Sequence, residues 1–176
     1  MKFYNLKEAN EETAILDIFG EIGVNFFSDE EQNTGKAIKD FVDEIKKINS
    51  KELVVNINSP GGDVNDGLVI YDAIKSFPGK KIVNITGLVA SAASVIAMAG
   101  DQINMSENSL LLIHRAMTMA MGNANDMQEV IDTLKKIDNL LINIYKNQTG
   151  RRDHTIENLM NENNGHGKFL NAEEAL

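Results

Sequence analysis

Acyl-transfer chemistry needs a hydroxyl or thiol nucleophile, a base within hydrogen-bonding reach, and backbone N–H groups that face the developing oxyanion. The chain contains no cysteine, so serine is the favoured nucleophile. The segment GLVASAAS, residues 87–94, places Ser91 among small residues where a strand is expected to meet a helix. Unpaired N–H groups at a helix start suit an anionic intermediate, whereas Ser94 lies one turn further in. Ser91 is therefore the first candidate, and a tightly packed helix is the alternative interpretation.

A base and a peptide-docking loop are also suggested by the sequence. Of three histidines, only His114 follows an apolar strand, and an imidazole is the natural proton carrier near neutral pH. The stretch NSPGG, residues 58–62, ends another apolar run, and the bare backbone of Gly61 and Gly62 would let an extended peptide dock. A core histidine and a plain turn remain alternative explanations of these residues.

The elements that must position these residues follow from apolar patterning. Short apolar runs bounded by glycine, proline and polar residues predict strands at residues 14–19, 53–57, 81–85, around 103 and at 110–113. Apolar residues at helical spacing predict a first helix that starts at a Ser28–Glu31 capping box and runs to about residue 48. The same spacing predicts further helices at 68–74, from about 91, at 127–145, at 155–160 and after Asn171.

Strands that alternate with helices predict an α/β fold with a largely parallel sheet and covering helices. In such sheets, sites form at the carboxyl ends of the strands, where both the NSPGG loop and Ser91 are expected. A chain of 176 residues without an internal repeat or a long linker is expected to form a single domain over residues 1–176.

Composition narrows the classes of partner. The formal net charge of −9 argues against nucleic acid and anionic membrane surfaces, since both repel an acidic protein. The absence of cysteine excludes disulfides and thiolate metal sites. No apolar stretch near the N-terminus is typical of a signal peptide, and the apolar run at residues 87–100 is too short to span a bilayer. We therefore expect a cytoplasmic protein.

Four short stretches in this order resemble the Clp protease proteolytic subunit family: INSPGG at 57–62, GLVASAA at 87–93, LIH at 112–114 and FLNAEEA at 169–175. The resemblance runs from about Glu21 to the end of the chain and is nearest to the phage or prophage branch, whose members accompany capsid genes. It implies the fold shared by Clp peptidases and crotonases, with a long helical handle after His114, and a serine endopeptidase that needs no cofactor.

The same resemblance implies the roles of individual residues. Ser91 would attack the peptide carbonyl, His114 would take its proton, and the N–H groups of Gly62 and Ala92 would hold the oxyanion. Gly61 and Gly62 would form the substrate-binding loop. The product of the attack is an acyl-enzyme, and the implied substrate is a peptide or protein, such as a phage head protein during processing.

The third member of the triad departs from the family, which expects an acidic residue in the loop before Phe169. Counting forward from Ile156 reaches Asn163, and counting back from Phe169 reaches Gly167, because about four residues are inserted. Neither is acidic. An asparagine orients the imidazole in papain-like enzymes, so Asn163 is one candidate, and the neighbouring carboxylate of Glu162 is another.

Assembly and the chain ends follow from the resemblance in the same way. Members form homo-oligomeric rings, heptamers that are often stacked in pairs, and we expect such a ring here. The N-terminal part is shorter than the segment that gates typical members, so we do not expect an ATPase partner. The family usually continues with another strand, so we expect that the chain lacks its C-terminal end.

Three other functions compete with the peptidase hypothesis. A crotonase-like enzyme would hold a coenzyme A thioester oxyanion with backbone N–H groups and would need no serine. A serine–lysine peptidase would need a lysine in the nucleophile segment, which has none. A catalytically inactive structural subunit of a ring or phage head would explain the missing acidic residue.

Overall fold

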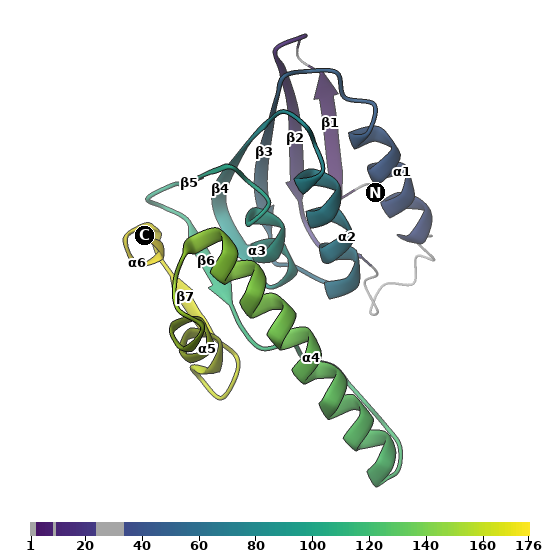
Figure 1. Ribbon diagram of the computed structural model, residues 1–176, viewed down its shortest axis with the longest axis vertical. Helices are drawn as coiled ribbons and strands as arrows, with labels where there is room; N and C mark the ends of the chain where they lie inside the picture. Colours follow the sequence, from purple (N-terminus) through teal and green to yellow (C-terminus); the bar gives the residue numbers. More distant parts are fainter. Residues whose placement is uncertain (1–2, 9, 24–33) are drawn as a thin grey trace. The chain divides into compact units, whose positions relative to one another are not determined.

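The computed structural model describes residues 3–8, 10–23 and 34–176 (Figure 1). The chain forms two compact units. The first unit comprises residues up to Leu112 together with Phe169–Leu176, and the second comprises Ile113–Lys168. Among the described residues, no helix has the length and apolar character needed to cross a membrane.

The first unit is built on a sheet in the order β1-β2-β3-β4-β6-β7, with β5 also paired to β4. Parallel pairs join β2 to β3, β3 to β4, β4 to β5 and β4 to β6, and β1 pairs antiparallel with β2. The fold prediction of a largely parallel sheet is therefore confirmed. The strands are β1 (Tyr4–Glu8), β2 (Thr13–Phe19), β3 (Glu52–Ser59), β4 (Lys80–Ala90), β5 (Gln102–Met105), β6 (Leu110–Ile113) and β7 (Lys168–Leu170).

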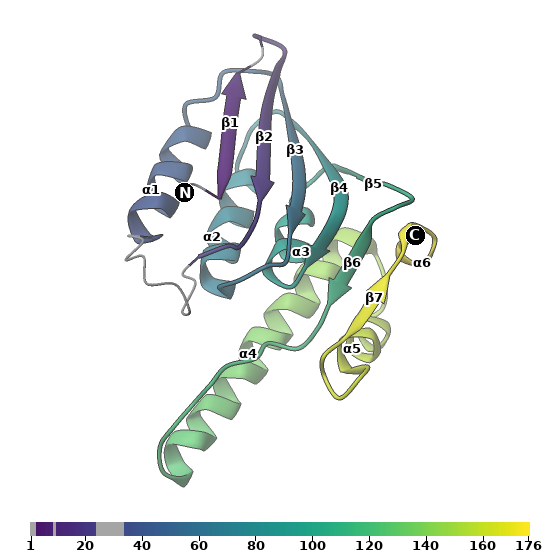
Figure 2. The same cartoon turned by 180° about the vertical axis from the view of Figure 1, so that it is seen from behind.

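Three helices of the first unit, α1 (Thr34–Ile45), α2 (Val64–Lys75) and α3 (Ala92–Ala97), lie on one face of this sheet (Figures 1 and 2). Alternate strand residues face them, because side chains along a strand point to opposite sides. Apolar side chains from the strands and from the helices together form the core, which includes Leu16, Ile18, Phe41, Leu53, Ile57, Ile70, Ile74, Ile85 and Ile96. The short helix α6 (Ala172–Ala175) follows β7 as predicted after Asn171, and Asn171 and Glu174 form a capping box at its start.

Side-chain hydrogen bonds cross the other face of the sheet from strand to strand. Asn56 donates to Asp17, Asn84 donates to Asn56, and Asn104 donates to Asn84, at 2.8, 2.9 and 3.0 Å. Each donor lies opposite its acceptor in the strand register. This row of polar side chains links the four strands β2 to β5 in their register.

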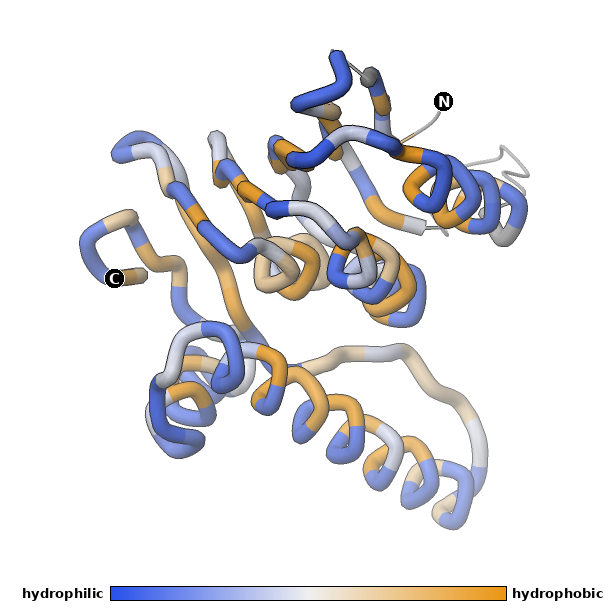
Figure 3. Tube along the Cα trace, turned by 45° about the horizontal axis from the view of Figure 1, so that its top comes forward, coloured by the Kyte–Doolittle hydropathy of each residue, from blue (hydrophilic) through white to orange (hydrophobic). Residues whose placement is uncertain are grey.

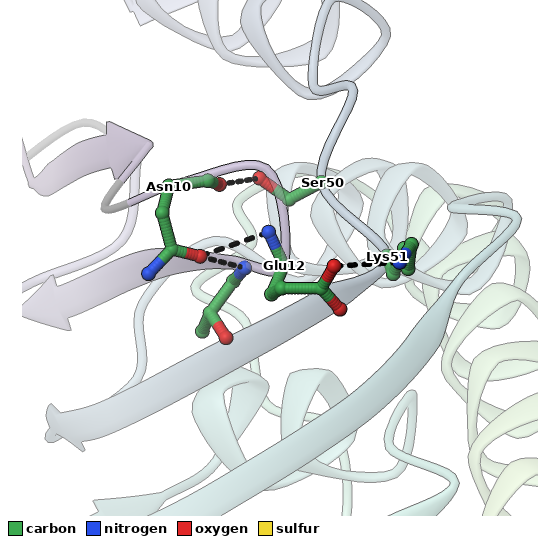
Figure 4. A network of polar contacts seen from close by, with 5 residues as sticks. Asn10, Glu12, Ser50 and Lys51 are labelled. Atoms are coloured by element: carbon green, nitrogen blue, oxygen red, sulfur yellow. Dashed lines mark hydrogen bonds and ion pairs between the residues drawn. The ribbon is translucent and has the colours of Figure 1, made fainter.

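The turn between β1 and β2 is held by a polar network at the amino ends of the parallel strands (Figure 4). The side-chain oxygen of Asn10 accepts from the N–H groups of Glu12 and Thr13, both at 2.8 Å, and its carbonyl accepts from the Ser50 hydroxyl at 2.8 Å. Lys51 pairs with Glu12 at 2.6 Å on the surface. The hairpin is thereby attached to the segment that leads into β3.

The second unit contains the long helix α4 (Ala124–Thr149) and α5 (Asp153–Asn161). Figure 3 shows apolar residues along one side of α4 and polar residues along the other. Asn123 and Asp126 form a capping box at its start, and Gly150 ends it in the left-handed conformation, shortly after the predicted range of 127–145. The family resemblance implied this helical handle, and the helix is present.

The other predicted elements are confirmed with three differences. The third predicted strand does not stop at Gly87, because β4 passes through a bulge there and continues to Ala90. Strand β1 was not predicted, since its alternation of polar and apolar residues is short. The stretch 161–168, rich in Asn and Gly, predicts a loop, but its last residue, Lys168, begins β7. The Ser28–Glu31 capping box lies outside the described residues.

Candidate active site

Ser91 occupies the single residue between β4, which ends at Ala90, and α3, which begins at Ala92. Its φ of 56° and ψ of −129° are unusual for a residue with a side chain. Such a conformation costs about 1–3 kcal/mol and persists only where surrounding contacts enforce it. A strained strand-to-helix turn is also the device that presents a nucleophilic serine in α/β-hydrolases. The side chain is partly exposed, so the turn presents a reachable hydroxyl.

Hydrogen bonds hold the turn from two sides. The N–H of Ser91 donates to the carbonyl of Leu112 on β6 at 3.1 Å. The carbonyl of Ser91 accepts from the N–H of Ser94 at 2.9 Å and from its hydroxyl at 2.6 Å. Because Ser94 is fully buried and its hydroxyl is engaged in this bond, the structure favours Ser91 over Ser94 as nucleophile.

The glycine loop after β3 lies directly against this turn. A Cβ atom added to Gly61 would lie 2.5 Å from the Cβ of Ser91 and 3.0 Å from the backbone nitrogen of Ala92. Gly61 also has a φ of +95°, so both its conformation and its surroundings require glycine. The structure therefore brings together three of the residues that the sequence singled out.

The two expected oxyanion donors also belong to the first unit. Within the described part of the chain, neither the N–H of Gly62 nor that of Ala92 has a hydrogen-bond partner. Ala92 is only 4% exposed, and unpaired N–H groups of buried residues are rare in folded proteins. Gly62 is anchored by a bridge to Ile22, whose carbonyl would overlap any Cβ at position 62. Among the described residues, both donors therefore lack an acceptor.

The start of α2 fixes the far end of the glycine loop. Asp63 caps the helix by accepting from the N–H groups of Asn65 and Asp66 at 2.8 and 3.0 Å. Burial, together with the neighbouring Asp63, raises the pKa of Asp66 above its ordinary value. The cap sets where the chain leaves Gly62 and turns into the helix.

His114 opens the second unit's polar cluster, directly after β6. Its Nδ1 lies 2.6 Å from the carbonyl oxygen of Arg115. A carbonyl only accepts, so Nδ1 carries the proton in this contact, and in the neutral ring Nε2 is then a free acceptor. This is the tautomer that a general base requires.

The loop before β7 contains the candidates for the third triad member. The Asn163 side chain donates its amide to the carbonyl of Gly167 at 2.9 Å, and Glu162 ends α5 with an exposed side chain. Gly167 itself packs on the backbone before the imidazole: an added Cβ would overlap the carbonyl of Ile113 and lie 2.7 Å from the Cβ of His114. The position reached by counting back from Phe169 thus touches His114 but has no room for a side chain.

One carboxylate near His114 escaped the sequence reasoning. Asp138 on α4 is 7% exposed and accepts from the N–H of Ala116 at 2.8 Å and from the Arg115 guanidinium at 3.2 Å. A signal was present, because Asp138 lies four residues after Leu134 and three before Leu141, on the apolar stripe of the helix. A carboxylate on a buried helix face needs hydrogen-bond or ion-pair partners, so its position predicts a polar contact with another segment.

Comparison with known proteins gives consistent matches. The family model described as Clp protease matches residues 28–176. An ATP-dependent Clp protease proteolytic subunit from Ligilactobacillus salivarius is 30% identical over 128 residues, which cover 72% of this chain and 63% of that protein. A protein of the same description from Bacteroides fragilis is 30% identical over 156 residues, 84% of this chain and 74% of the relative. The chain thus spans less than two thirds of the first relative's length.

Proposed function

Because the chain belongs to the Clp protease family, we propose that it is a serine endopeptidase that hydrolyses peptide bonds through an acyl-enzyme. Ser91 is the nucleophile and His114 is its general base. The N–H groups of Gly62 and Ala92 bind the oxyanion, and Gly61 with Gly62 receives the substrate backbone. No cofactor takes part.

The observation that carries the proposal is the strained turn at Ser91. A serine with φ of 56° between a strand and a helix costs about 1–3 kcal/mol of free energy. The cost is explained if the hydroxyl must point away from the sheet toward a substrate. The adjacent Gly61 backbone and the N–H of Ala92, which has no partner among the residues that the structure describes, then complete the surroundings of a reacting carbonyl.

The pairing of Ser91 with His114 is part of the proposal. The parallel register of the first unit sets Ala90 opposite Leu112, and His114 follows Leu112 by two residues. In the reaction, the Ser91 oxygen bonds to the peptide carbonyl carbon while Nε2 of His114 accepts the hydroxyl proton. His114 returns this proton to the leaving amine as the peptide bond breaks. Water then attacks the ester by the same route and restores the serine.

The test is labelling by a fluorophosphonate probe together with hydrolysis of an unstructured peptide by the wild-type protein and by Ser91→Ala. We expect loss of labelling and a fall in kcat of about 10⁶-fold, as for removal of a nucleophile from a triad. The exposed Ser106 provides the matched control, since Ser106→Ala should keep both signals. Equal hydrolysis by wild type and Ser91→Ala would end the proposal, and saturable coenzyme A binding would favour a crotonase-like enzyme.

Assembly and substrate are finer parts of the proposal. We propose a homo-oligomeric ring that cleaves proteins, phage head proteins among them. Exposed apolar side chains support self-association: Met117, Met119 and Met121 are 62, 84 and 100% exposed, and Ile131 and Leu140 on α4 are each 44% exposed. Native mass spectrometry should give the mass of a heptamer or a pair of heptamers, and peptide hydrolysis should proceed without ATP. A monomer at every concentration would contradict the ring.

A further inference from the structure

A single peptide unit lies between the imidazole of His114 and a buried carboxylate. The carbonyl of Arg115 accepts from Nδ1 of His114 at 2.6 Å. The N–H on the other side of the same peptide bond, that of Ala116, donates to Oδ1 of Asp138 at 2.8 Å. The order imidazole, carbonyl, N–H, carboxylate is therefore continuous, and all of its members belong to the second unit.

The amide group transmits polarisation between its two ends. A hydrogen bond to a carboxylate is charge-assisted and draws the N–H proton toward the anion. This increases the negative charge on the carbonyl oxygen, and chains of hydrogen bonds strengthen one another by about 10–30% per bond. The Arg115 carbonyl is thus a better acceptor for the imidazole than an isolated peptide would be, and it stabilises positive charge on the ring.

Burial and charge fix this arrangement. Asp138 is 7% exposed, and both of its oxygens are used: Oδ1 by the peptide and Oδ2 by the Arg115 guanidinium at 3.2 Å. The guanidinium is held in turn by Asn161, whose side-chain oxygen accepts from Nε at 2.7 Å. The N–H of Arg115 donates to the carbonyl of Gly165 at 3.1 Å. The peptide between Arg115 and Ala116 is bonded at both its carbonyl and its N–H, and the peptide before it is bonded to Gly165, so a rotation would break these hydrogen bonds.

We infer that Asp138 is a positioning residue that sets the tautomer and orientation of His114 through the peptide bond between Arg115 and Ala116. The inference rests on the proposed function, in which His114 is the general base. Asp138, a carboxylate on α4, thus orients the imidazole in place of the missing acidic triad member, although it does not contact the ring directly. Asn163 and Glu162 then have no direct part in holding the ring.

The test is Asp138→Asn, measured by peptide hydrolysis and by ¹⁵N NMR of labelled histidine, which distinguishes the Nδ1–H from the Nε2–H tautomer. We expect kcat to fall by at least about tenfold with little change in KM, yet less than the roughly 10⁴-fold cost of removing a direct aspartate partner. The Nδ1–H population of His114 should fall as well. Asp132→Asn is the matched control: the same change on the same helix, at an exposed carboxylate bonded to Gln128.

A second variant separates the peptide from the guanidinium. Arg115→Met removes the ion pair but keeps the backbone carbonyl and N–H groups, so His114 should retain its Nδ1–H tautomer. An equal loss of this tautomer in Arg115→Met and Asp138→Asn would overturn the inference, because the ion pair would then suffice. If Asp138→Asn does not fold, Ala116→Pro deletes the donating N–H and also fixes φ at position 116, and an unchanged tautomer there would also overturn the inference.

The NMR measurement keeps this inference distinct from the proposed function. It is made on the Ser91→Ala protein as well, where no hydrolysis is needed. A tautomer that responds to Asp138→Asn, in a protein without Ser91-dependent hydrolysis, supports the link and contradicts the peptidase. If hydrolysis depends on Ser91 but the His114 tautomer is unchanged in Asp138→Asn, the peptidase proposal is supported and the role of Asp138 is overturned.

Discussion

Replacement of Gly61 by alanine tests whether the glycine loop lies against the nucleophile turn. The new Cβ would be 2.5 Å from the Cβ of Ser91 and 2.5 Å from the carbonyl oxygen of Ala90. Ordinary contact begins at 3.4 Å, so the loop and the turn must separate by roughly 1 Å. The neighbours are backbone and a Cβ, which have no rotamer to relieve the overlap.

Two costs contribute to the expected loss of stability in Gly61→Ala. A side chain at positive φ costs about 1–2 kcal/mol, and overpacking of a closely packed site costs about 1–3 kcal/mol. We therefore expect the free energy of unfolding to fall by about 2–5 kcal/mol. Displacement of the nucleophile by about 1 Å should lower kcat/KM by about 10²-fold.

Gly20→Ala is the matched control. Gly20 has a φ of +85°, close to the +95° of Gly61, but a Cβ there would meet nothing within 4 Å. This variant should show only the conformational cost, with kcat/KM unchanged. Urea unfolding and peptide hydrolysis of both variants measure the difference. Equal stability losses in the two variants, together with wild-type kcat/KM in Gly61→Ala, would refute the placement of the loop against Ser91.

Three further predictions follow from other contacts. Ser94→Ala should keep fluorophosphonate labelling of Ser91 while losing about 1 kcal/mol of stability, and loss of labelling with an intact fold would transfer the nucleophile role to Ser94. Gly167→Asp, which restores an acidic residue at the position expected from the family, should destabilise the protein without raising kcat, because its Cβ would overlap a backbone carbonyl; a gain in kcat would contradict this packing. Burial raises the pKa of Asp101, but hydrogen bonds from Lys81 outweigh this and hold it below its ordinary 3.8, so the carboxylate contributes stability that is lost as the pH falls below about 4. Asp101→Asn should flatten the dependence of the urea midpoint on pH in that range, and parallel curves would contradict it.

The order of elements could be predicted because most of them have one strongly apolar face. The strands β2 and β3 and the helix α4 carry their buried residues at periods that identify the element type. The extension of β4 could not be predicted, since Gly87 normally ends a strand. Here the side-chain oxygen of Asn58 accepts from the N–H of Leu88 at 3.1 Å, and this contact lets β4 resume after the bulge.

The nucleophile could be proposed from sequence, but the feature that distinguishes it could not. GLVASAAS is equally consistent with a packed helix, because small residues suit close helix contacts as well as substrate access. The strain at Ser91 arises from contacts with Leu112, 21 residues away, and with Gly61, 30 residues away in the opposite direction. A local pattern does not show which distant groups force a residue into an unfavourable conformation.

The role of the triad acid can pass to a residue on another element while the hydrogen bond at Nδ1 of the histidine is kept. Counting along the chain assumes that the acid stays on the loop before β7, where Gly167 leaves no room for it. What an imidazole base needs is an acceptor at Nδ1 with negative character, and the Arg115 carbonyl provides this once Asp138 polarises its peptide. Asp138 is 24 residues from His114 and on another element, so only the hydrogen bonds of the folded second unit connect them. We therefore expect that Gly167→Asp will not raise kcat, whereas Asp138→Asn will lower it. The two variants together decide which residue takes the role of the triad acid.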